Sequence, residues 1–136
     1  MKAIKFLVLL IITAGMSTAC SAQSEKTSEK TAVAANDEVH VYYFHNTRRC
    51  ATCKAVESET QKILKEAYGD KVAFTSLNLE EKAGEEKAEE LGVSGQSLLI
   101  VCGEKKYNIT NHGFMNARTN PDKLKDVILT KIDPLL

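Results

Sequence analysis

The stretch VYYFHNTRRCATCK, residues 41–54, decides the fold because it joins a strand pattern directly to a pair of cysteines. Its first residues are aromatic or β-branched, with too little polarity for a solvated face. They predict a central strand over 39–45 that is covered on both sides. A helical spacing of apolar residues follows the cysteines, so Cys50 lies at the strand-to-helix junction and Cys53 lies one turn further on.

This position of Cys50 has a chemical consequence. The free backbone N–H groups and the positive end of a helix dipole favour thiolate over thiol, and Arg48 and Arg49 add positive charge that should lower the pKa of the thiol. Because the thiolate is the nucleophile of disulfide exchange, we expect Cys50 to attack and Cys53 to resolve the mixed disulfide. Two alternatives stay open: the two sulfurs could bind a soft metal or metalloid, or form a purely structural disulfide.

The remaining chain has readable periodicities. The helix after the cysteines ends at Gly69, a second strand over 71–79 is expected to be buried on both faces, and a helix over 80–91 ends at Gly92. A third strand over 97–102 turns tightly at 103–104 into an edge strand over 105–110, and Asn120 and Pro121 begin the last helix. The element order is therefore βαβαββα, which indicates an α/β domain with a covering helix after an antiparallel hairpin.

The N-terminus predicts an export signal over residues 1–20. Lys2 and Lys5 precede an apolar run that is too short for a permanent membrane helix, and small residues lead to Cys20. Two cleavage sites compete. STAC resembles a bacterial lipobox, in which case Cys20 would be acylated and become the mature N-terminus. Alternatively, an ordinary signal peptidase would cut after Ala22.

Both alternatives place the mature chain in the cell envelope, facing the periplasm or the outer surface. Residues 21–37 are small, polar and charged, and they predict a flexible linker before a domain over 38–136. If Cys20 is acylated, the membrane is a partner through the lipid anchor. After removal of the export signal, which contains Lys2 and Lys5, the chain has sixteen basic and eighteen acidic residues. It therefore lacks the excess of basic residues that would indicate nucleic-acid binding.

Two resemblances follow from these motifs. The order βαβαββα with Cys-x-x-Cys at the first strand-to-helix junction is similar to the thioredoxin-like three-layer sandwich, which has a mixed four-stranded sheet. More narrowly, YFHNTRRCATC, GVSGQSLLIV, GFMNART and the closing IDPLL resemble the nitrophenyl compound nitroreductase subunit ArsF family. This resemblance implies a bacterial oxidoreductase or electron carrier that passes reducing equivalents to a partner protein through the Cys50 face, a chemistry that needs no cofactor.

The sequence also departs from the thioredoxin pattern. Thioredoxins have a buried acid on the first strand, where this chain offers only Tyr42, Tyr43 and Phe44. They also have a cis-proline facing the cysteines, where this chain has Gln96 or Ser97, so we expect trans peptide bonds there. The loop 95–97 is still expected to form part of the docking surface, although the loss of the proline ring leaves the sulfurs less shielded and favours the metal alternative.

Other residues are candidates for the rim of the site. The connection 111–120 is expected to be a loop beside the cysteines, in which Gly113 permits the close approach of a partner backbone and Phe114 supplies an apolar contact. His45 could relay a proton or bind a metal, or be a half-exposed bystander. Cys102 is expected to be a small buried hydrophobic residue. A third hypothesis for the whole chain is a degenerate fold that serves only as an adaptor subunit.

Overall fold

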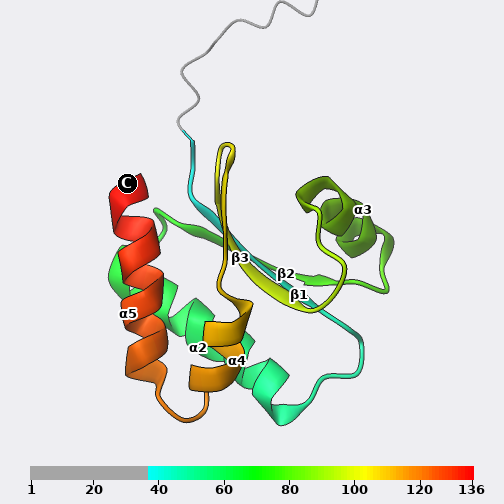
Figure 1. The fold of residues 1–136 in the computed structure, drawn as a ribbon, viewed down its shortest axis with the longest axis horizontal. Helices are drawn as coiled ribbons and strands as arrows, with labels where there is room; N and C mark the ends of the chain where they lie inside the picture. Colours follow the sequence, from blue (N-terminus) through cyan, green and yellow to red (C-terminus); the bar gives the residue numbers. More distant parts are fainter. Residues whose placement is uncertain (1–36) are drawn as a thin grey trace, which may run out of the picture. The chain divides into compact units, whose positions relative to one another are not determined.

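The computed structural model describes residues 37–136 (Figure 1). The predicted export signal, Cys20 and the linker up to residue 36 lie outside this part of the chain. Within residues 37–136, no helix combines the length and the apolar character needed to cross a membrane.

The order of elements agrees with the sequence pattern except for two additions, helix α4 (Thr110–Asn116) and a short 3-10 helix at the end. The elements are β1 (His40–His45), α2 (Ala51–Tyr68), β2 (Ala73–Asn78), α3 (Lys82–Leu91), β3 (Ser97–Cys102), β4 (Lys105–Asn108), α4 (Thr110–Asn116), α5 (Pro121–Ile132) and a short 3-10 helix (Asp133–Leu135).

The four strands form one mixed sheet in the order β2-β1-β3-β4. β1 is parallel to β2 and antiparallel to β3, and β3 pairs with β4 as a hairpin. The predictions of a central β1 and an edge strand β4 are confirmed. The prediction that β2 is buried on both faces is wrong: β2 is an edge strand and all six of its residues are half-buried. Because β2 pairs only with β1, its other edge has no neighbouring strand to cover it.

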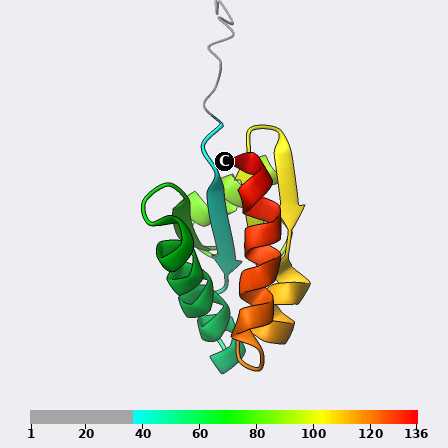
Figure 2. The same ribbon diagram turned by 90° about the vertical axis from the view of Figure 1, so that its left-hand side faces the viewer.

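Helices cover both faces of the sheet and make three layers (Figure 1). Alternate residues of β1 point to opposite faces, as the two-residue period of a strand requires. Val41 and Tyr43 join the large core under α2, α4 and α5, whereas Phe44 joins a smaller core under α3. Figure 2 shows α2 and α5 side by side over the same face. The cores on both faces hold the carboxyl end of β1, and with it the start of α2, in a fixed position.

The helix ends lie where the capping residues predicted them. Asn120 caps α5, since its side-chain oxygen accepts a hydrogen bond from the Lys123 backbone N–H at 3.2 Å, and Pro121 is the first helical residue. Gly69 and Gly92 follow the last residues of α2 and α3.

The expected loop over 111–120 is wrong in its first part, which forms α4. The Thr110 hydroxyl accepts a hydrogen bond from the Leu98 backbone N–H at 2.9 Å and ties the start of α4 to β3. Gly113 is buried, and a Cβ there would lie 3.2 Å from the Leu98 side chain and 3.3 Å from the Val56 side chain. Because Gly113 has no side chain, α4 can pack closely against α2 and β3. The backbone at Gly113 is buried by this packing and is not exposed to a partner.

Candidate functional site

Cys50 and Cys53 form a disulfide at the start of α2, with their Cα atoms 5.1 Å apart. Cys50 is the N-cap of the helix: its Sγ accepts a hydrogen bond from the Cys53 backbone N–H at 3.1 Å. Cys50 is exposed, whereas Cys53 is only 4% exposed. One sulfur therefore faces solvent and receives a helix N–H, while the other is covered.

Gln96 faces the covered sulfur from the opposite loop. Its Oε1 lies 3.5 Å from Cys53 Sγ, so in the dithiol form the Cys53 thiol can donate to this oxygen. The expectation of trans peptide bonds is confirmed, since no cis bond occurs within residues 37–136. Ser97, the other candidate at this place, begins β3, and its hydroxyl donates to the Gly95 carbonyl at 3.0 Å. Of the two, Gln96 is the residue that the fold brings to the sulfurs.

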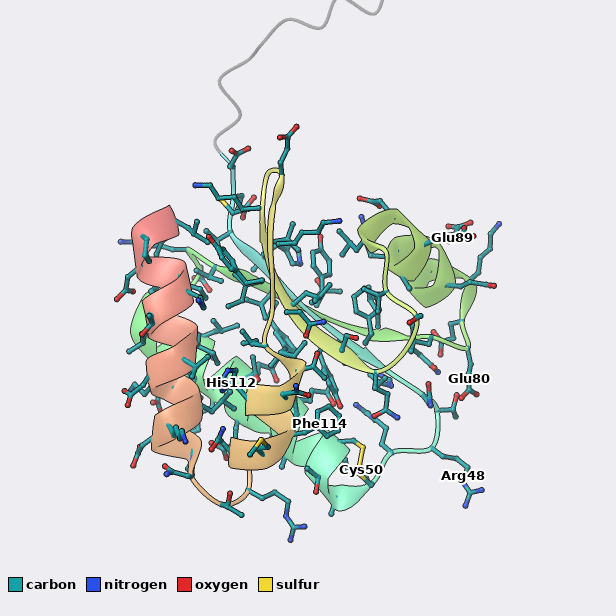
Figure 3. All side chains as sticks on the ribbon, in the orientation of Figure 1. Arg48, Cys50, Glu80, Glu89, His112 and Phe114 are labelled. Carbon is teal, nitrogen blue, oxygen red and sulfur yellow. A yellow bond between two sulfur atoms is a disulfide. The ribbon has the colours of Figure 1, made fainter. Side chains whose placement is uncertain are left out.

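The two arginines before Cys50 have different surroundings. Arg48 is exposed, and Figure 3 shows its side chain directed away from the disulfide into solvent. Arg49 forms an ion pair with Glu57, one helical turn after Cys53, and both side chains are about three-quarters covered. The positive charge of Arg49 is therefore largely offset. The influence of Arg48 and Arg49 on the pKa of the Cys50 thiol therefore remains a prediction.

Tyr43 lies beneath the cysteines on β1 and is fully buried. Its hydroxyl donates to the Cys53 carbonyl at 3.0 Å. Burial and, to a smaller extent, the nearby Glu57 carboxylate raise the pKa of Tyr43 to about 12, while the positive charge of Arg49 opposes this shift. Tyr43 therefore stays protonated near neutral pH and acts as a hydrogen-bond donor that holds the first turn of α2 on the sheet.

The segment between β1 and Cys50 is held by residues that the sequence reasoning missed. The Thr47 backbone N–H donates to Glu80 Oε1 at 3.2 Å, and the Asn78 side-chain amide donates to the Thr47 hydroxyl at 3.0 Å. Because β1 and β2 are parallel and pair His45 with Asn78, both strands end at the same edge. Polar residues at and just after the ends of the two predicted strands were the signal that could have found this contact.

The remaining candidates from the sequence are His45, Phe114 and Cys102. His45 is buried at the end of β1, with Nδ1 3.0 Å from the Asn46 carbonyl. Phe114 is half-buried against the large core, and Figure 3 shows it beside the α2 terminus that carries Cys50. Cys102 is buried, as predicted, and its Sγ lies 3.1 Å from the Asp37 carbonyl at the other end of the sheet. Cys102 therefore takes no part in this site.

Within residues 37–136, no group of three or more histidine, cysteine, aspartate or glutamate side chains is arranged to hold a metal ion. In this part of the chain, a soft metal or metalloid would be held by the two sulfurs of Cys50 and Cys53 without such a group of three ligands. The metal alternative therefore stays a prediction, and no observed contact favours it over disulfide exchange.

Comparisons with known proteins show a likeness in structure and none in sequence. No protein-family model matches the sequence, and no curated protein is similar to it in sequence. Among solved structures, oxidised thioredoxin O2 from Arabidopsis thaliana is similar with a TM-score of 0.51 and 20% identity, over 69% of this chain and 75% of that one. The germline-specific thioredoxin Deadhead from Drosophila melanogaster is similar with a TM-score of 0.50 and 21% identity, over 71% and 84%.

The likeness lies in the backbone, as the low identities show. The mixed sheet with helices on both faces is the common element, and the disulfide of this chain lies at the junction between its first strand and the helix that follows. The chain therefore has the thioredoxin-like fold, with Cys50 and Cys53 at the N-terminus of α2.

Proposed function

We propose that this protein exchanges thiols and disulfides with a partner protein. The observation that carries the proposal is the asymmetry of the two sulfurs: Cys50 is exposed and accepts a helix N–H at 3.1 Å, whereas Cys53 is covered and faces the Gln96 oxygen at 3.5 Å. A donor stabilises a thiolate and an acceptor stabilises a thiol. The surroundings of the pair therefore support Cys50 as the nucleophile and Cys53 as the resolving thiol.

The exchange transfers two electrons. In the reducing direction the Cys50 thiolate attacks one sulfur of the partner disulfide, a bond forms between them, and the second partner sulfur leaves as a thiolate that takes a proton from solvent. Cys53 then loses its proton to solvent and attacks Cys50 Sγ, which releases the first partner sulfur as a thiolate that takes a proton from solvent. The products are the Cys50–Cys53 disulfide and two partner thiols. The reverse sequence oxidises a partner dithiol, and the difference in reduction potential sets the direction.

The partner docks at the exposed face of Cys50 in this proposal. Phe114 and the neighbouring Met115, which is 72% exposed, supply apolar surface on the α4 side. The resemblance of the motifs to the nitrophenyl compound nitroreductase subunit ArsF family supports a partner that receives reducing equivalents. Both the narrower family and the identity of the partner remain predictions.

Trapping of the mixed disulfide tests the assignment of roles. The reduced full chain is mixed with a protein disulfide substrate, quenched with acid and separated on a non-reducing gel. The Cys53→Ser variant is expected to accumulate a covalent adduct through Cys50, because nothing resolves it. The Cys50→Ser variant is expected to form no adduct, and Cys102→Ser, which changes the buried thiol at the other end of the sheet, serves as the matched control. If neither single variant at the pair alters exchange, the proposal is wrong.

The proposal places the mature chain in the cell envelope, with a lipid on Cys20. The lipobox-like STAC sequence and the polar linker over 21–37 support this location. Cells grown with labelled palmitate should incorporate the label into the wild-type chain and not into Cys20→Ala. A mature wild-type chain that is unlabelled and begins at residue 23 would instead show cleavage by an ordinary signal peptidase.

A further inference from the structure

A groove of about 480 Å³ lies between α3 and the loop that leads into β3. Its apolar lining comes from Leu79, Ala88 and Val93, which belong to or pack against the smaller core under α3. Its polar lining includes three glutamates, Glu80, Glu85 and Glu89. No lysine or arginine is among the lining residues, so the groove combines an apolar surface with carboxylates of one sign.

One residue, Gln96, connects the groove with the dithiol. Gln96 lines the groove and also lies 3.5 Å from Cys53 Sγ. Glu80, at the near end of the groove, accepts a hydrogen bond from the backbone of Thr47, in the segment that leads to Cys50. Figure 3 shows Glu80 and Glu89 on the α3 side of the molecule, on the same side as this segment. A polypeptide bound covalently to Cys50 can therefore extend into the groove.

The carboxylates of α3 differ in how they are paired. Glu86 lies 3.7 Å from Lys82 Nζ, and Glu90 lies 2.6 Å from Lys87 Nζ, so these two have basic partners on the helix. In contrast, within residues 37–136 neither Glu85 nor Glu89 has an ion-pair partner.

Glu85 and Glu89 are also four residues apart on one helix, a spacing at which like charges destabilise the helix. The unpaired carboxylates of α3 are therefore the two that line the groove. A cation bound in the groove would relieve their repulsion.

Building on the proposed function, we infer that the groove binds a lysine or arginine side chain of the partner polypeptide, close in sequence to the cysteine that Cys50 attacks. The methylene stem of such a side chain suits Leu79, Ala88 and Val93, and its charged head suits Glu85 and Glu89. The groove thus selects, among protein disulfides, those flanked by basic residues.

Peptide substrates test this inference. Two peptides that differ only in carrying two lysines or two glutamates beside a single cysteine are joined by a disulfide to a chromophoric aromatic thiol. The rate of thiol release by the reduced full chain is measured at low and high salt. A third peptide, which carries two glutamines at the same positions, and a small neutral disulfide serve as uncharged references. The groove variant is Glu85→Gln/Glu89→Gln. The matched control, Glu86→Gln/Glu90→Gln, removes the same charge at the same spacing from positions of α3 that do not line the groove.

Wild type and control are expected to react about tenfold faster with the lysine peptide than with the glutamate peptide at low salt, and this ratio should shrink at high salt. The groove variant should lose most of the preference and keep its rate with the neutral disulfide. Equal rates for both peptides in wild type, or an equal loss of preference in both variants, overturn the inference and leave disulfide exchange intact. No reaction with the neutral disulfide overturns the proposed function itself.

Discussion

The close contact between α3 and the end of β2 predicts that a side chain at Gly84 destabilises the protein. A Cβ atom added to Gly84 would lie 1.9 Å from the Asn78 carbonyl oxygen and 3.2 Å from the Leu79 backbone nitrogen. Both neighbours are backbone atoms held in place: Asn78 O accepts from the Glu81 N–H at 3.1 Å, and Leu79 N donates to the His45 carbonyl at 2.8 Å. Since the backbone of 78–79 cannot yield cheaply, Gly84→Ala must push α3 away from the sheet.

The size of the effect follows from this geometry. Restoring an ordinary contact of at least about 3.4 Å requires a displacement of about 1.5 Å. Overpacking of this kind costs about 1–3 kcal/mol, and two fixed backbone atoms place Gly84→Ala near the upper end. The better helix propensity of alanine returns at most about 1 kcal/mol. We therefore expect Gly84→Ala to lower the free energy of unfolding by about 2 kcal/mol.

Urea unfolding followed by circular dichroism measures this difference. Gly95→Ala is the matched control, because a Cβ at Gly95 would have no atom within 4 Å and its φ is not positive. The control should leave stability unchanged or raise it by up to about 1 kcal/mol, since alanine restricts the unfolded chain. If Gly84→Ala unfolds at the same urea concentration as wild type, or if Gly95→Ala loses as much stability, the reasoning from close backbone contact fails.

Three further variants test the packing and the electrostatics. Tyr43→Phe removes the hydrogen bond to the Cys53 carbonyl and should cost about 0.5–1.5 kcal/mol in urea unfolding; an unchanged midpoint would contradict a role in anchoring α2. Thr60→Val should instead raise the thermal midpoint by a few degrees, about 1 kcal/mol, because the Thr60 hydroxyl is buried without a hydrogen-bond partner within residues 37–136; a lower midpoint would contradict this. Burial lowers the pKa of His40, which also hydrogen-bonds Thr75 at 2.8 Å. Its contribution to stability should be complete above about pH 7 and decrease as the pH falls through about 6.5 and below, because the unfolded chain then binds the proton more readily. The difference in unfolding free energy between wild type and His40→Gln should shrink over that range, and a constant difference would refute the assignment.

Local patterns were sufficient for most of the elements. A run of aromatic and β-branched residues specifies β1 through its own period, and Asn120 with Pro121 specifies the start of α5 through bonds made within one turn. The same holds for the most reactive feature of the site. The position of Cys50 at a helix N-terminus depends only on where the strand pattern ends and the helical spacing begins.

The elements that the sequence did not reveal depend on distant partners. Residues 110–116 contain weak helix formers, and α4 forms there because Gly113 allows close packing against Val56 and Leu98. The intermediate burial of β2 likewise follows from its place at the edge of the sheet. Packing that joins distant segments overrides weak local preference, and a local pattern cannot reveal which segments will meet.

The sequence by itself determined the order of strands and helices along the chain and the pair of sulfurs at a helix N-terminus, because each depends on residues a few positions apart. Only the tertiary structure decided what surrounds the pair. Gln96 reaches Cys53 across 43 residues, and Glu80 reaches Thr47 across 33. The pairing register of three strands sets those distances, and this register is fixed only when both faces of the sheet are covered by their helices.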